Sequence, residues 1–163
     1  MRSLLHVKPI YIYNFFLILI FSILVNSDYN FEIFYSTIYC FFYFLLIYLG
    51  IYYYRKLLYI IFFLYGVGLD LILINEIGPH LLIFMITLIQ LKFISKYLYS
   101  LSPIKIYFTL LILELIVIFL VMLTSIIFFN LIANIDYLIQ ITVLSFIMSV
   151  PVFLFFSKID QLK

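Results

Sequence analysis

The sequence is poor in charged, small and sulfur-containing residues. It has no tryptophan, one cysteine, four glycines and four prolines, and only 10% of its 163 residues are charged, whereas soluble domains carry about 25%. The lone Cys40 excludes an intrachain disulfide, and one thiol makes no metal site. The net charge of +2 gives no support for nucleic-acid binding. Because 69% of the residues are hydrophobic, composition predicts one all-α integral membrane domain over residues 1–163.

The few charges alternate in sign along the chain. Short segments at the ends of apolar runs hold all nine basic residues, and the segments between them hold acids. The basic residues are Arg2, Lys8, Arg55, Lys56, Lys92, Lys96, Lys105, Lys158 and Lys163, and the intervening acids are Asp28, Glu32, Glu76 and Asp136. Basic side chains near the ends of membrane spans stay in the cytoplasm. The alternation therefore predicts six spans with both termini in the cytoplasm.

The apolar runs have the length that membrane-spanning helices need, since about 20 apolar residues cross the hydrocarbon layer. The predicted spans are 9–26, 33–54, 57–75, 79–97, 105–129 and 137–157. The fourth span requires Lys92 and Lys96 to extend their ammonium groups to the interface, because its uninterrupted apolar part is short. The first span could instead be a signal peptide, but no small-x-small cleavage site follows it, so we expect it to be retained.

Two acids, Asp70 and Glu114, lie within the predicted spans. A carboxylate in lipid costs about 2.5–3.5 kcal/mol and is a functional candidate. Because every basic residue lies at an interface, we expect both acids to face the bundle interior, hydrogen-bonded or protonated. Their depths, at about 1.5 Å per residue, predict contacts of Asp70 with Thr87 and of Glu114 with Gln90. Helix–helix attachment is the favoured interpretation, with proton or ligand handling as the alternative.

Glycines accompany the first of these acids. Gly66 lies four residues before Asp70, so the two share a helix face, and Gly68 lies between them. A glycine on that face allows a neighbouring backbone to approach closely, and helix packing is the interpretation we favour. The pattern fails as a phosphate-binding loop, because a third glycine and a βαβ context are missing.

The sequence contains no recognisable catalytic or cofactor motif. Glu76 and His80 flank Gly78 in the predicted outer turn, but two ligands without a third do not make a zinc site. There is no HExxH, no close pair of acids and no polar cluster on the cytoplasmic side. We therefore expect no enzymatic activity and no cofactor or metal.

One stretch resembles the best-marked region of the rod shape-determining protein MreD family. It reads Gly66-Val-Gly-Leu-Asp70-Leu-Ile-Leu-Ile-Asn-Glu-Ile-Gly78-Pro-His80-Leu-Leu. The family pattern has glycines and an acid in the third span, then an outer turn with glycine, a frequent histidine and an apolar span. Chain length, spans from end to end and an inner N-terminus also agree. The sequence departs from the pattern at Glu76-Ile77, where small residues and a proline are usual.

The resemblance implies a non-catalytic protein of the bacterial inner membrane that supports rod shape and lateral peptidoglycan synthesis. Its implied partners are MreC, the actin-like MreB, and the glycosyltransferase RodA with its penicillin-binding transpeptidase. Its implied fold is similar to that of the substrate-binding subunits of energy-coupling-factor vitamin transporters. A vitamin-type binding subunit stays open as an alternative, and it predicts an outward-facing polar pocket lined by Asp70 or Glu114. An intramembrane enzyme would need a catalytic constellation that the sequence lacks.

Overall fold

The computed structural model describes residues 9–26, 32–73, 76–98, 102–129 and 135–161, and this part of the chain forms six helices. They are α1 (Pro9–Asn26), α2 (Glu32–Tyr52), α3 (Leu57–Leu73), α4 (Pro79–Leu98), α5 (Pro103–Phe129) and α6 (Ile135–Gln161). Each helix falls on one of the predicted spans, and the ends differ by a few residues at most. The predicted all-α class is confirmed.

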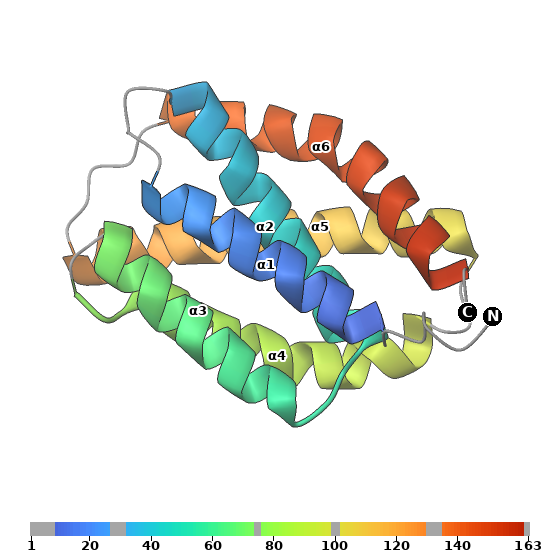
Figure 1. Cartoon of the computed structure of the whole chain (residues 1–163). Coiled ribbons are helices and arrows are strands. Elements are labelled where there is room, and N and C mark those ends of the chain that lie inside the picture. Colours follow the sequence, from blue (N-terminus) through green and yellow to red (C-terminus); the bar gives the residue numbers. More distant parts are fainter. Residues whose placement is uncertain (1–8, 27–31, 74–75, 99–101, 130–134, 162–163) are drawn as a thin grey trace.

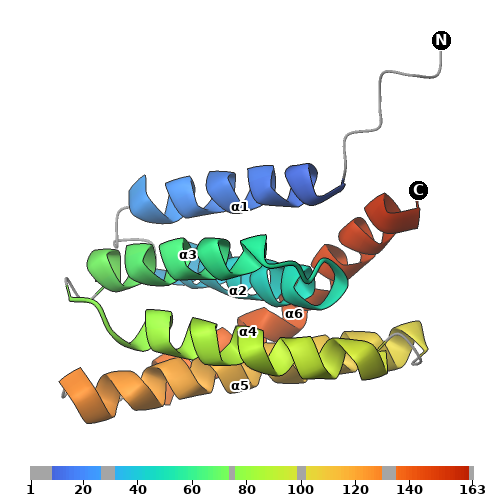
Figure 2. The ribbon, with the colours of Figure 1, turned by 90° about the horizontal axis from the view of Figure 1, so that it is seen from below.

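Consecutive helices run in opposite directions (Figures 1 and 2). The starts of α1, α3 and α5 therefore lie at the same end of the bundle as the last turns of α2, α4 and α6. The exposed basic side chains towards this end, hereafter the basic end, are Arg55, Lys56, Lys92, Lys105 and Lys158. The opposite end carries the exposed acids Glu76 and Asp136. The alternation of charge along the sequence thus becomes a separation of charge in space.

Helix α2 lies at the centre of the bundle and contacts α1, α4, α5 and α6. Every side chain from Phe42 to Leu49 is buried, as expected for a helix that is apolar all round. The surrounding helices expose large apolar side chains such as Phe15, Leu64 and Phe119. Polar groups such as Ser36 and Asp70 are buried instead. Apolar groups outside and polar groups inside suit lipid as the solvent, because lipid cannot satisfy hydrogen bonds.

Three segments are long and apolar enough to cross a membrane, as judged by length and composition. These are Ile33–Tyr52, Ile104–Phe128 and Ile135–Lys158. The segments Tyr11–Asn26, Leu57–Leu73 and Pro79–Ile94 are apolar but shorter. The structure therefore indicates an all-helical membrane protein.

Helices α3 and α4 pack closely because of Gly66. A Cβ atom on Gly66 would lie 2.7 Å from the Cα atom of Leu81 and 3.1 Å from its backbone nitrogen. The close backbone approach predicted at this glycine is therefore present. At Gly68 an added Cβ would lie 2.5 Å from the far end of the Phe21 ring, which belongs to α1. Only the contact at Gly66 is with backbone, so only there would a whole helix have to move.

We expect Gly66→Ala to lower the free energy of unfolding by about 1–3 kcal/mol, because overpacking displaces α4. Gly68→Ala is the matched control. It should stay within ~1 kcal/mol of the wild type, since the Phe21 ring can rotate and alanine favours the helix. Unfolding of the purified protein with a denaturing detergent, followed by circular dichroism, measures both. Equal effects of the two substitutions would contradict the close approach of α3 and α4.

Candidate functional site

The carboxylate of Asp70 forms a set of hydrogen bonds that joins α3 to the start of α4. It lies in the last turn of α3 and is completely buried. Oδ1 accepts the backbone N–H of His80 at 2.9 Å and contacts Nδ1 of the same residue at 2.7 Å. Oδ2 accepts the backbone N–H groups of Gly78 at 2.9 Å and of Leu81 at 3.0 Å. Both oxygens therefore take two hydrogen bonds each from the start of α4.

The sequence at the start of α4 explains why this carboxylate is needed. The first N–H groups of a helix have no acceptor within the helix. The first backbone bond here runs from Leu82 N–H to the Gly78 carbonyl at 3.1 Å. Gly78 has no side chain to act as a cap, and the first turn of α4 contains no acid. Asp70 supplies the missing acceptor from the preceding helix, and its negative charge suits the positive end of the α4 dipole.

His80 extends this cap to the central helix. Its Nε2 atom lies 2.9 Å from the hydroxyl of Tyr39, which lies 2.8 Å from the hydroxyl of Tyr43. A carboxylate can only accept, so Nδ1 carries a proton. In the neutral ring Nε2 then accepts the Tyr39 O–H, and Tyr39 accepts the O–H of Tyr43. This Asp70–His80–Tyr39–Tyr43 network connects α3, α4 and α2 through polar contacts.

The network is closed to its surroundings. Asp70 and Tyr43 are 0% exposed, His80 is 3% exposed and Tyr39 is 6% exposed. The ring of Phe84 covers it, with its centroid 5.2 Å from that of Tyr43 and 6.2 Å from that of His80. A carboxylate, an imidazole and a hydroxyl linked by successive hydrogen bonds also form the arrangement that activates catalytic nucleophiles. Here the hydroxyl belongs to a buried tyrosine, and the arrangement joins helices.

The predicted contact between Asp70 and Thr87 is wrong, because the carboxylate is engaged by the first turn of α4. Thr87 follows His80 by seven residues, which places it about 10 Å further along α4. The prediction counted residues from Leu57 at the inner edge and from Pro79 at the outer edge of a hydrocarbon core about 30 Å thick. In the structure α3 ends at Leu73 and the chain returns so that Asp70 is level with His80.

The second acid, Glu114, is 1% exposed and lies where α5 meets α6. Its Oε1 atom accepts the hydroxyl of Ser145 at 3.1 Å, and its Oε2 atom has no hydrogen-bond partner among the described residues. The predicted contact with Gln90 is wrong, because Gln90 is exposed on α4. Depth along a helix gives the height of a side chain and says nothing of the direction in which it points. Leu88 and Leu91 occupy the buried face of α4.

The sequence did not predict the hydrogen bonds of four residues, namely Tyr39, Tyr43, Ser145 and Cys40. The tyrosines carried a usable signal, because Tyr39 and Tyr43 are four residues apart and hence share one face of α2. Cys40 donates its thiol to the carbonyl of Ile141 at 3.6 Å, which joins α2 to α6. Nothing in the local sequence marks Ser145, since several serines and threonines occur in α6.

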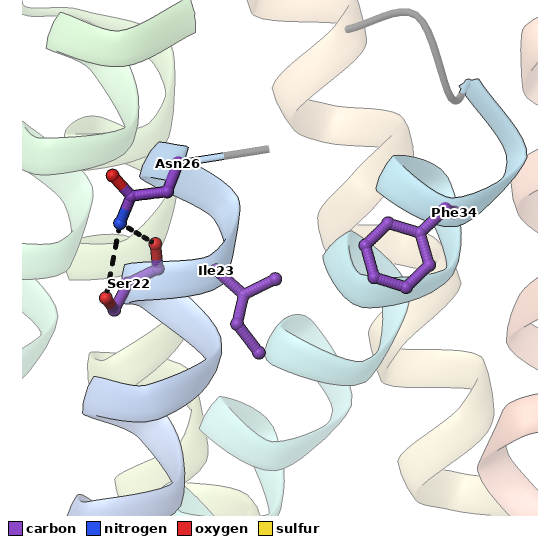
Figure 3. Close-up of a pocket in the computed structure, with 4 residues that line it drawn as sticks. All are labelled: Ser22, Ile23, Asn26 and Phe34. Atoms are coloured by element: carbon purple, nitrogen blue, oxygen red, sulfur yellow. Dashed lines mark hydrogen bonds between the residues drawn. The ribbon is translucent and has the colours of Figure 1, made fainter. Parts of the chain in front are cut away.

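A surface pocket of about 330 Å³ lies between the last turns of α1 and the start of α2 (Figure 3). It is lined by Ser22, Ile23, Asn26 and Phe34. The amide of Asn26 donates to the Ser22 carbonyl at 2.7 Å and to its hydroxyl at 3.5 Å. The pocket contains neither buried acid, so it differs from the pocket that a vitamin-type binding subunit was expected to have.

Comparisons with known proteins do not assign this chain to a family. No protein-family model, curated protein or solved structure matches it. Within the described ranges, no group of three or more His, Cys, Asp or Glu side chains could hold a metal ion. The resemblance to MreD therefore depends on the residues of this sequence alone.

We expect Asp70→Ala to lower the free energy of unfolding by about 3–5 kcal/mol, because it leaves three backbone N–H groups and an imidazole buried without their acceptor. Glu76→Ala, which removes an exposed acid only six residues away, is the control and should change stability by less than ~0.5 kcal/mol. Detergent-induced unfolding of the two variants compares them directly. A loss below ~1 kcal/mol for Asp70→Ala would show that the cap does not hold α4.

Proposed function

We propose that this protein is a non-catalytic scaffold of the bacterial inner membrane, similar to MreD, that supports rod shape and lateral peptidoglycan synthesis. The observation that carries the proposal is that four residues of the family-like stretch form one joint. Asp70 caps the helix that begins after Gly78, His80 passes the contact on to α2, and Gly66 lets α4 approach α3. A shared motif that builds a helix–helix joint is what a scaffold requires.

The same proposal includes six spans with both ends in the cytoplasm. Three helices are long and apolar enough to cross a membrane by length and composition. The others, α1, α3 and α4, have 18, 17 and 20 residues, within the range of about 17–25 for a spanning helix. The antiparallel order places the exposed cations at one end, and the positive-inside rule assigns that end to the cytoplasm.

In this proposal the outward face of α5 receives a partner helix. Large exposed apolar side chains recur there every three or four residues and so form one stripe. The stripe consists of Phe108, Ile112, Ile116, Phe119 and Leu123. Helices associate in lipid through van der Waals packing, which a continuous apolar stripe can supply. We assign this stripe to the membrane span of MreC. In the same proposal MreB binds at the basic end, and RodA with its transpeptidase lies beside this protein in the membrane.

Co-purification with MreC from native membranes tests the proposal. Asp70→Leu should lower the yield of the complex and the fraction of rod-shaped cells, because α4 and the α5 packed on it lose their position. Since Asp70→Leu also destabilises the fold, a second variant is required. Ile112→Ala combined with Ile116→Ala should lower the yield of the complex while the protein itself stays folded and abundant in the membrane.

The matched control is Ile86→Ala combined with Ile89→Ala, which removes the same side chains from an exposed part of α4. It should leave the complex intact. Full yield of the complex and normal cell shape with both Asp70→Leu and the α5 variant would reject the scaffold proposal. Equal losses with the α4 and α5 variants would reject the assignment of the partner to α5.

A further inference from the structure

A groove of about 310 Å³ lies between the first turns of α5 and the last turns of α6. It is lined by Ile104, Tyr107, Val150, Phe153 and Leu154. Its volume is at the lower end of the range of about 300–1,000 Å³ found for ligand sites. The lining side chains are apolar apart from one phenol, and that phenol is already engaged, because the Tyr107 hydroxyl lies 2.8 Å from the Ser149 hydroxyl.

The course of α6 opens this groove. Phe153 still packs on α5, with its ring centroid 5.4 Å from that of Tyr107. After Phe153 the helix reaches α1, where the rings of Phe156 and Tyr13 have centroids 5.0 Å apart. Figure 2 shows the last turns of α6 rising towards the start of α1, away from the start of α5. Pro151 lies two residues before Phe153, inside the helix, and a proline inside a helix removes one backbone hydrogen bond and favours a bend. The groove is therefore built into the fold.

The two helices that form the groove each carry one exposed lysine near the basic end. Lys158 follows Leu154 by four residues and so lies on the same face of α6, one turn closer to the end of the helix. Lys105 is adjacent to Ile104 in the first turn of α5. Both side chains are exposed. An apolar groove between two helices that carry cations near the basic end is complementary to a ligand with an apolar chain and a negative headgroup.

We propose that this groove binds one acyl chain of an anionic phospholipid, whose phosphate group contacts Lys105 and Lys158. Basic sites between transmembrane helices recognise anionic headgroups in this way. A partner helix would fill the apolar groove without using the lysines, and a free phosphate would use the lysines without filling the groove. The lipid uses both features. This inference does not depend on the scaffold role, because it requires only that the basic end lies at a membrane surface.

The test uses the full chain, purified in a neutral detergent, and measures its melting temperature as phosphatidylglycerol is added. Binding to the folded state raises the melting temperature. Phosphatidylcholine with the same acyl chains should raise it less, and glycerol phosphate without acyl chains should not raise it. Lys105→Gln combined with Lys158→Gln should weaken the apparent affinity for phosphatidylglycerol about thirty-fold, to the level of phosphatidylcholine. Val150→Trp, which fills the groove, should weaken the response to both lipids.

Arg55→Gln combined with Lys56→Gln is the matched control, because it removes two exposed cations from the same end of the bundle but outside the groove. It should keep the wild-type response to phosphatidylglycerol. An equal loss in this control would show diffuse surface attraction and overturn the proposal. Equal stabilisation by the two lipids, or by glycerol phosphate alone, would also overturn it, in favour of an unselective apolar groove or a simple anion site. Native mass spectrometry of the same samples counts the lipid molecules retained.

Discussion

The start of α4 depends on a carboxylate that belongs to another helix. A helix whose first turn is buried has N–H groups that neither water nor its own backbone can satisfy. Here Gly78 and Pro79 provide no capping side chain, and Asp70 of α3 accepts three of these N–H groups. The rest of the arrangement follows from this contact. It fixes α4 against α3 and directs the His80 ring towards Tyr39 of α2.

The sequence predicted the helices well because the lipid environment makes apolar runs of spanning length easy to recognise. It also predicted that Asp70 and Glu114 would be buried and that Gly66 would admit a close neighbour. It failed on the partners of both acids. Counting residues gives height along a helix, whereas partners also depend on helix rotation and on how the chain returns between helices. Gln90 has the right height for Glu114 but points outward.

Polar side chains such as Asp70 and Glu114 form hydrogen bonds inside the bundle, and large apolar side chains cover much of its outer surface. The Asp70–His80–Tyr39–Tyr43 network joins three helices, and Ser145 with Glu114 joins α5 to α6. In lipid such hydrogen bonds select one arrangement of helices, while apolar faces serve for contacts with other spans or with lipid chains. This separation of polar and apolar groups agrees with the proposed role in assembly.

Amide hydrogen exchange, resolved by residue with NMR in lipid nanodiscs, tests the cap most directly. The backbone N–H groups of Gly78, His80 and Leu81 lack acceptors within α4 and depend on Asp70. We predict that they exchange as slowly as amides in the middle of α4, and that Asp70→Asn speeds exchange at these positions before any other part of α4. Fast exchange at all three positions in the wild-type protein, with the rest of α4 protected, would contradict the account.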